Sequence, residues 1–413
     1  MTAHHTPLPS PYLIGTAALL ALAVAMGVGR FAFTPLFPLM VRDGLLSADS
    51  GAWLAAANYL GYLLGALLAG RLPTLPARLL QLGLLGIVLL TAAVGWGQEV
   101  LLWAVLRFLA GLLSAWALVA TSAWGLGWLA ACGRPQLAGV IYAGVGLGIT
   151  VVGLFCLLLP VLAPGSRAGE LWQWLGLAAA LPAGLAIIVA QRHPRVPLPS
   201  PTPTASPAAN TANATTPGSW GLILSYSLFG FGYILPATYL PAQARQLIDD
   251  PQVFGWAWPL FGLAAATSTL VVAFGLRGAN RLRVWTFCHL LLAGGVLLPV
   301  LSPGLPAIIG AALLVGSTFM VITMLGMQEA RHRAGAQGPQ HATRMLGRMT
   351  AGFALGQLLG PLAALGMARL TTWLSLPSGL AFPLALLLAA AGLLGSAVLL
   401  WRQSSPAATA PTH

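Results

Sequence analysis

Twelve long apolar stretches dominate this chain and limit the folds that it can adopt. Each holds at least the eighteen residues that a helix needs to cross the hydrocarbon core of a bilayer. They cover residues 12–40, 52–70, 79–96, 100–131, 137–163, 171–190, 220–243, 253–276, 284–301, 305–328, 345–370 and 380–400. Backbone polar groups in lipid must be satisfied within their own segment, so each stretch is predicted to be an α-helix. The sequence therefore predicts an all-α membrane protein with twelve transmembrane helices.

Composition agrees with this class and excludes a soluble domain. Charged residues make up 6% of the chain and hydrophobic residues 58%, against roughly 25% and 45–50% in soluble proteins. So few charges could not cover the surface of a soluble protein of 413 residues. The cysteines, Cys132, Cys156 and Cys288, are far apart and lie in apolar surroundings. We therefore expect neither a disulfide framework nor a metal site.

The distribution of arginine indicates the orientation of the chain. If both termini are cytoplasmic, thirteen of the 19 basic residues lie on the cytoplasmic side, four lie outside, and Arg30 and Arg107 lie within helices. The positive-inside rule predicts this bias, so the net charge of +12 reflects topology and we expect no nucleic-acid partner. Every basic residue is arginine, which indicates the codon bias of a GC-rich bacterium. We therefore place the chain in a bacterial inner membrane with both termini cytoplasmic.

Residues 194–219 divide the helices into two sets of six. This segment is rich in Pro, Ala, Thr, Ser and Asn and has almost no apolar bulk, so it cannot bury enough surface to fold. We interpret it as a flexible cytoplasmic linker; a phosphorylated or partner-binding segment is the alternative. The predicted organisation is an N-terminal tail (1–11), an N-terminal six-helix bundle (12–193), the linker, a C-terminal six-helix bundle (220–402) and a C-terminal tail (403–413).

A repeated segment relates the two bundles. Residues 27–38 open with Gly27-Val28-Gly29 and close with a proline, and residues 230–241 repeat both features at the same spacing. Arg30 in the first copy stands opposite Tyr233 in the second. Parallel repeats of this kind are related by an axis along the membrane normal, so we expect a pseudo-twofold arrangement of six plus six helices.

Glycines recur at matching places in the fifth helix of each bundle. Such glycines let helix backbones approach closely and let helices slide or bend. The sequence does not decide between close packing and a mechanical role. We single out as candidate gating or hinge positions Gly27, Gly29, Gly144, Gly148, Gly356 and Gly360.

These features resemble the major facilitator superfamily. The segment from Arg107 to Gly111 is similar to its Arg-x-x-x-Gly motif, and residues 144–153 resemble its fifth-helix glycine motif without the usual proline. The loop after the second helix lacks the acidic residue that the superfamily places there. Residues 27–35, 327–331 and 356–361 resemble the YbfB/YjiJ-type bacterial transporters. The resemblance implies a major facilitator fold and an inner-membrane transporter, in which helices one and four of each half line a central cavity.

Two arginines within helices are the main candidates for a binding site. A charged side chain at the centre of a membrane helix costs about 2.5–3.5 kcal/mol on insertion scales, so it usually has a function. No carboxylate lies deep in a predicted span to neutralise Arg30 or Arg107, and guanidinium groups bind carboxylates in bidentate fashion. We interpret Arg30 as an anion-binding residue. The alternative is that both arginines bond backbone carbonyls freed by Gly and Pro, and for Arg107 we favour a structural or gating role.

Uncharged polar residues at the depth of the bilayer are further candidates for substrate contact. They either contact substrate or form hydrogen bonds between helices, and the sequence does not separate these roles. The residues are Asn58, Tyr59, Tyr142, Tyr233 and Gln357.

The sequence contains no grouping typical of an enzyme. Ser-His-Asp sets, metal clusters, nucleotide-binding loops and paired carboxylates are all missing from it, so we expect neither catalysis nor a cofactor. We predict a monomeric secondary active transporter that moves a small organic solute, with an organic anion favoured, by alternating access. A proton-coupled efflux pump for amphipathic compounds is the alternative, and a membrane sensor that does not transport is a third. The sequence leaves three possibilities open: proton coupling through the substrate's own carboxylate, proton coupling through His289, or no proton coupling.

Overall fold

A computed structural model describes residues 8–197, 219–247, 255–302, 304–335 and 338–404. Its regular elements within these ranges are helices, and twelve of them are long and apolar enough to cross a membrane. The predicted all-α membrane protein with twelve transmembrane helices is thereby confirmed. Most of the linker predicted at 194–219 and most of both tails lie outside the described residues.

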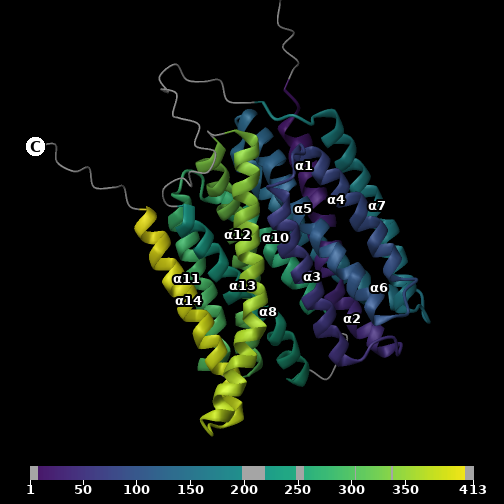
Figure 1. The fold of residues 1–413 in the computed structure, drawn as a ribbon, viewed down its shortest axis with the longest axis vertical. Coiled ribbons are helices and arrows are strands. Elements are labelled where there is room, and N and C mark those ends of the chain that lie inside the picture. The colour runs from purple at the N-terminus through teal and green to yellow at the C-terminus, as the bar shows by residue number, and fades with distance from the viewer. Residues whose placement is uncertain (1–7, 198–218, 248–254, 303, 336–337, 405–413) are drawn as a thin grey trace, which may run out of the picture.

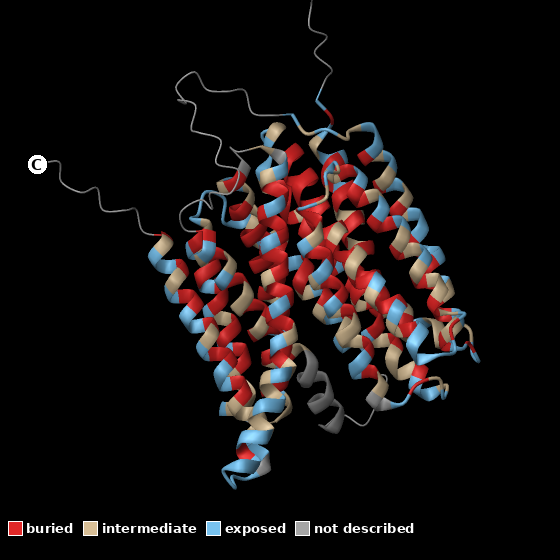
Figure 2. Ribbon diagram, in the orientation of Figure 1, coloured by how far each residue is buried: buried red, intermediate tan, exposed pale blue. Residues whose placement is uncertain are grey.

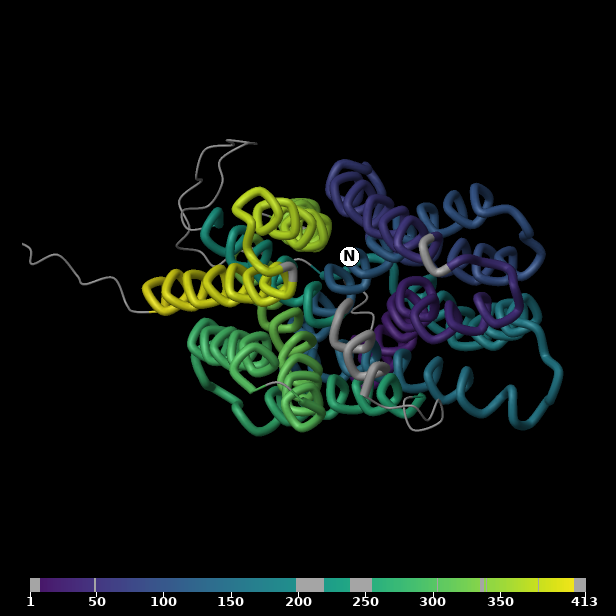
Figure 3. Tube along the Cα trace, turned by 90° about the horizontal axis from the view of Figure 1, so that it is seen from below, coloured from purple at the N-terminus to yellow at the C-terminus, as the bar shows by residue number. Residues whose placement is uncertain are grey.

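The described helices form two groups, which lie side by side in Figures 1 and 3. The first group contains α1 (Pro11–Leu22), η1 (Ala23–Phe31), α2 (Phe33–Arg42), α3 (Ala48–Ala69), α4 (Pro76–Val94), α5 (Val100–Ala131), η2 (Pro135–Leu137), α6 (Ala138–Leu162) and α7 (Ala168–Arg192). The second contains α8 (Ser219–Leu247), α10 (Ala257–Gly275), α11 (Arg281–Leu301), α12 (Leu305–Gly335), α13 (Pro339–Trp373), η3 (Ser378–Leu380) and α14 (Ala381–Ser404). α1 begins and α14 ends at the same end of the molecule (Figure 1), as an even number of spans requires.

The first span is not a uniform α-helix. It runs from Pro11 to Arg42, and its middle third, η1, is a π-helix that contains Gly27, Gly29 and Arg30. A π-helix bonds each carbonyl to the N–H five residues on and is frequent at functional sites. Pro35 has no N–H, so it cannot satisfy a carbonyl of η1 one turn before it. The π-helix thus coincides with the segment that the sequence analysis singled out because of its arginine.

The two groups meet mainly along two helix pairs, α3 with α13 and α6 with α10. Small residues allow the contact: Gly146 of α6 lies against the backbone of Gly262 and Ala266 of α10. At the end where α1 begins, Arg344 of α13 donates a hydrogen bond from Nε to the carbonyl of Gly70 at 3.3 Å. The second span thus pairs with the eleventh and the fifth with the eighth, as the predicted pseudo-twofold relation between the halves requires.

The singled-out glycines lie where helices of the same half approach closely. In the first half, a Cβ at Gly144 or Gly148 would collide with the carbonyls of Leu19 and Ala23. In the second half, a Cβ at Gly356 would collide with the carbonyl of Ser227. The remaining three positions are equally close: Gly27 faces Gly148, Gly29 faces Ser114, and Gly360 faces Ile234. Close packing is therefore their role in this structure, and the gating role stays a prediction.

Buried residues fill the interior of the bundle (Figure 2), and many large apolar side chains are exposed on its outside. On α4, for example, Leu82, Leu85 and Leu89 repeat on one face and are 55%, 53% and 60% exposed. Contiguous exposed leucines would aggregate in water and are stable against lipid tails. The structure thus presents a lipid-facing surface around a packed core.

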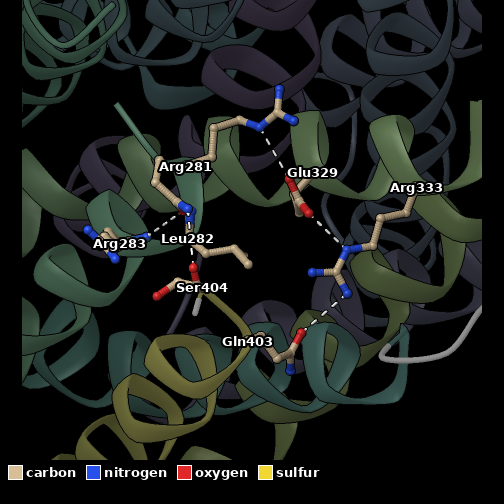
Figure 4. A network of polar contacts seen from close by, with 8 residues as sticks. Arg281, Leu282, Arg283, Glu329, Arg333, Gln403 and Ser404 are labelled. Carbon is tan, nitrogen blue, oxygen red and sulfur yellow. Dashed lines mark hydrogen bonds and ion pairs between the residues drawn. The ribbon is translucent and has the colours of Figure 1, made fainter. Parts of the chain in front are cut away.

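Charged contacts collect at the end of the bundle where α14 finishes. Glu329 of α12 accepts hydrogen bonds from Nε of Arg281 at 3.2 Å and from Nε of Arg333 at 2.8 Å (Figure 4). Arg333 also donates to Oε1 of Gln403 at 3.2 Å. This network joins the ends of α11, α12 and α14 within the second half.

Candidate functional site

Arg30 lies between the two halves of the molecule, and its side chain is only 4% exposed. Its Nη2 donates a hydrogen bond to Oε1 of Gln357, which comes from α13 in the other half. The other two nitrogens, Nε and Nη1, are buried and have no hydrogen-bond partner among the described residues. A buried donor without a partner costs its full desolvation energy. The guanidinium therefore has unused capacity for an acceptor.

Aromatic rings surround this guanidinium from both halves. The Cζ of Arg30 lies 3.9 Å from the ring centre of Tyr62 and 5.6 Å from that of Tyr59, both on α3. Phe31 lies at 5.7 Å and Phe353 of α13 at 5.8 Å. Ring faces attract a cation within about 6 Å, so the rings hold the positive charge in place without neutralising it.

No carboxylate of the described residues forms an ion pair with this charge. The ion pairs in that part of the chain join Arg42 to Asp43 and join Arg281 and Arg333 to Glu329. Arg30 is therefore a desolvated cation whose surroundings contain hydrogen-bond acceptors and π-faces but no paired negative charge. Such a site has the electrostatics to accept an anion.

Arg107 has a different environment, although it is also buried. Its Nη1 donates to the carbonyl of Gly29 at 3.2 Å and its Nη2 to the carbonyl of Arg30 at 3.0 Å. The guanidinium also lies over the ring of Phe33, 5.0 Å from its centre. These contacts match the alternative raised from the sequence, a bond to carbonyls near Gly and Pro. Arg107 thus holds the π-helix that carries Arg30.

The uncharged polar candidates divide between two environments. Gln357 and Tyr59 touch Arg30, and Tyr233 lies one ring further out, with its ring centre 6.2 Å from that of Phe353. Asn58 instead donates from Nδ2 to the carbonyl of Arg107 at 2.9 Å.

Tyr142 lies apart from this group. Its hydroxyl is 2.8 Å from Oγ of Ser122, within the first half. The structure therefore brings Arg30, Tyr59, Tyr233 and Gln357 together, and it places Asn58 and Tyr142 in contacts between helices of one half.

Sequence reasoning missed most of the aromatic residues at this site. Tyr62 lies closest to the guanidinium, and Phe31, Phe319 and Phe353 complete the surroundings. Tyr62 had a usable signal, because it follows Tyr59 by three residues and so shares its helix face. Phe319 and Phe353 had none, since apolar residues at helical spacing are typical of any membrane span.

Asp43 lies just after α2, outside the membrane spans, and fixes the start of α7. Its Oδ2 accepts the N–H of Ala168 at 2.6 Å, and its Oδ1 accepts from Nε of Arg42 at 2.8 Å. Burial raises the pKa of the Asp43 carboxyl, but the hydrogen bonds from Arg42 and Ala168 outweigh burial and lower that pKa below its ordinary value. The charge is also favourable at a helix N-terminus.

Comparison with known proteins agrees with the fold. A protein-family model described as "Uncharacterised MFS-type transporter YbfB" matches residues 22–400. Among solved structures, the chain is similar to the human organic anion transporter MFSD10 (TETRAN), with 16% sequence identity and a TM-score of 0.67. That similarity covers 96% of this chain and 99% of the other. No curated protein sequence matches this chain.

Proposed function

Because this chain belongs to the YbfB-type family of major facilitator transporters, we propose that it is a secondary active transporter of a small organic anion. The observation that carries the proposal is Arg30. Its guanidinium is buried between the halves, two of its nitrogens lack partners in the described part of the chain, and no described carboxylate pairs with it. A substrate carboxylate would supply the missing charge and an acceptor for one of these nitrogens, because each edge of the guanidinium pairs one of them with Nη2.

Substrate binding would compete with a contact between the halves. The Nη2 of Arg30 bonds Gln357 across the interface. A bidentate carboxylate takes two parallel N–H groups of a guanidinium, so it would draw Arg30 away from Gln357 or share it. Anion binding would thereby weaken one tie between η1 and α13.

Alternating access supplies the movement in this proposal. The halves rock about a central site that opens to one side at a time. At the end where α1 begins, the bond from Arg344 to the carbonyl of Gly70 and the contact of Gly347 with the carbonyl of Ala66 hold α13 against α3. Opening of the site toward that end requires both contacts to separate.

The fold relative supports the class of substrate. That relative is the human organic anion transporter MFSD10, and Arg30 is also suited on physical grounds to a negatively charged solute. The shared fold by itself does not carry a substrate from one protein to the other, because one fold hosts many functions. The environment of Arg30 is therefore what favours an anionic substrate here.

We also place the transporter in a bacterial inner membrane, because all of its basic residues are arginine, and both termini in the cytoplasm, because of the distribution of these arginines. One chain supplies residues of both halves to the site, so a monomer suffices for transport. His289 is fully buried within the second half, with its Nδ1 3.2 Å from the carbonyl of Trp285. Without access to water it is a poor proton carrier. The substrate's own carboxylate is the better candidate for coupling.

A second candidate function is proton-coupled efflux of amphipathic compounds. The ring-lined surroundings of Arg30 favour it, because aromatic side chains bind apolar bodies of many shapes. In this case Arg30 would be structural, and neutral or cationic dyes would compete with the substrate. A sensor that binds the same anion without moving it would show binding but no flux.

The test is uptake of organic anions by purified protein in lipid vesicles. Arg30→Gln should abolish the uptake of an anion that the wild type transports, while the variant still purifies as a monodisperse protein. Arg30→Lys keeps the positive charge but loses the planar guanidinium that binds a carboxylate through two hydrogen bonds, so it should retain part of the activity. Normal uptake by Arg30→Gln would refute the anion site, and competition by cationic dyes would favour efflux.

A further inference from the structure

The helix α4 carries an arginine at one end of its lipid-facing surface. Leu82, Leu85 and Leu89 are exposed on this helix, and Arg78 comes four residues before the first of them. Residues at these spacings lie on the same face of an α-helix. Arg78 is itself exposed. Its positive charge therefore lies at the end of a row of leucines that faces the lipid.

The neighbouring helix α7 repeats this arrangement in the opposite chain direction. Leu181, Leu185 and Ile188 are exposed on it, and the exposed Arg192 follows Ile188 by four residues. The helices α4 and α7 pack against each other and lie side by side in Figure 1. Since α4 begins where α7 ends, the two arginines lie at the same end of two adjacent apolar rows.

A cavity of about 790 Å³ joins these two arginines to a third. Arg78, Arg192 and Arg195 line it together with polar and apolar side chains, and none of the described residues that line it is acidic. None of the three arginines forms an ion pair with a carboxylate in the described part of the chain. The cavity therefore concentrates positive charge and has guanidinium donors available for an anion.

Arg195 lies beyond the end of α7, and two tryptophans of α5 fix this part of the chain. The carbonyl of His193 accepts a hydrogen bond from Nε1 of Trp124 at 2.8 Å and another from Nε1 of Trp128 at 3.1 Å. The ring of His193 also stands edge-on to that of Trp128, with the ring centres 5.8 Å apart. Val196 then lies against α5. The wall that carries Arg195 is thus held in place by contacts with α5.

The cavity lies away from the site around Arg30. All of its lining residues belong to the first half, between Leu8 and Pro197. The two halves instead meet mainly where α3 contacts α13 and where α6 contacts α10. A ligand of this cavity would therefore lie beside the lipid-facing helices α4 and α7 and not between the halves.

From the cavity and the two apolar rows we propose that this site binds an anionic glycerophospholipid of the adjoining leaflet. The lipid phosphate accepts hydrogen bonds from Arg78, Arg192 and Arg195, since guanidinium groups bind phosphate oxygens in bidentate fashion. The acyl chains lie along the exposed rows of α4 and α7. Gln81 and Gln191 also line the cavity, and their amides can bond the hydroxyl groups of a glycerol headgroup.

Charge separates this ligand from the other lipids of a bilayer. Basic pockets between membrane helices bind the headgroups of anionic lipids. A zwitterionic lipid carries a cation next to its phosphate, and three arginines without a carboxylate partner would repel that cation. We therefore expect the site to select lipids by net negative charge. The inference does not depend on the anion site at Arg30.

The experiment measures which lipid the purified wild-type protein retains in detergent. The protein is incubated with equal amounts of dioleoyl-phosphatidylglycerol and dioleoyl-phosphatidylcholine, and native mass spectrometry distinguishes the bound lipids by mass. The two lipids have the same acyl chains, so the ratio of their affinities reports the headgroup alone. We expect phosphatidylglycerol to bind at least about tenfold more tightly, because three arginines act on its charge.

Variants locate the preference at the cavity. The triple variant Arg78→Gln, Arg192→Gln, Arg195→Gln should bring the affinity ratio of the two lipids close to one. Arg192→Gln alone should lower the ratio by about fivefold, the ordinary contribution of one arginine near a membrane surface. Arg134→Gln is the charge-matched control, because Arg134 is exposed in the turn after α5 and is not among the residues that line the cavity. That variant should keep the wild-type ratio.

The soluble headgroup glycerophosphoglycerol distinguishes a lipid from a free phosphate ester. If it binds as tightly as phosphatidylglycerol, the cavity takes a soluble ester and the lipid proposal fails. Equal affinity of wild type for the two lipids would also overturn the proposal, as would an equal fall of the ratio in Arg192→Gln and Arg134→Gln. Each of these outcomes leaves the organic-anion function at Arg30 standing, since that function is tested separately by uptake.

Discussion

Gln357→Glu replaces the acceptor of Arg30 by a carboxylate of nearly the same shape. In the wild type, the amide oxygen accepts from the guanidinium and leaves its charge unpaired by any described carboxylate. In the variant, a fixed negative charge would stand where we place the substrate's charge. Two unit charges 4 Å apart attract by about 4 kcal/mol at an effective dielectric constant of about 20. A substrate must displace that partner, so its affinity should fall by up to roughly a thousandfold.

The assay is the uptake of the best-transported anion into vesicles, together with its dissociation constant for the purified protein. Gln357→Ala is the matched control, since it removes the bond between the halves without adding charge. We expect anion binding to persist in Gln357→Ala and to be lost in Gln357→Glu, with a higher melting temperature for the glutamate variant. Wild-type affinity in Gln357→Glu would refute the reasoning, because an anion cannot share the guanidinium with a fixed carboxylate at no cost.

Three further predictions concern the frame around the site. Arg107→Ala should lower the stability by about 3 kcal/mol or more, because two buried carbonyls of η1 lose charge-assisted hydrogen bonds; Arg107→Lys should recover part of this in thermal unfolding in detergent. Gly148→Ala should destabilise by about 1–3 kcal/mol through overpacking against a backbone carbonyl, whereas Gly184→Ala, with nothing within 4 Å of its Cβ, should be neutral or stabilising. The melting temperature of wild type should fall on acidification more steeply than that of Asp43→Asn. The pKa of Asp43 is lowered in the folded state, so its contribution is present above the unfolded-state pKa and is lost as the pH falls through the folded-state value.

The pairing of Arg30 shows how far the sequence could predict the site. The cost of a charge in lipid singled out this residue without any structure, and the same reasoning offered backbone carbonyls as an alternative partner. In the structure, the two expectations apply to two different arginines. Arg107 bonds the carbonyls, and Arg30 keeps two nitrogens without partners in the described chain. The sequence does not distinguish the two arginines, because the partners of each guanidinium depend on which helix it faces in the folded protein.

Length and polarity determined the twelve spans, because a bilayer demands about twenty apolar residues per helix and full internal hydrogen bonding whatever the side chains are. The polar segment 194–219 and the repeat of residues 27–38 at 230–241 predicted the two related halves. Tertiary structure alone decided what surrounds Arg30. Gln357 is 327 residues away in the chain, and Phe353, whose ring centre lies 5.8 Å from Cζ of Arg30, also comes from α13 of the other half. Contacts between helices in lipid depend on the fit of small and large side chains, which a hydropathy pattern does not indicate. Tertiary structure also decided the π-helix of the first span, because its carbonyls are bonded by Arg107, a side chain from another helix.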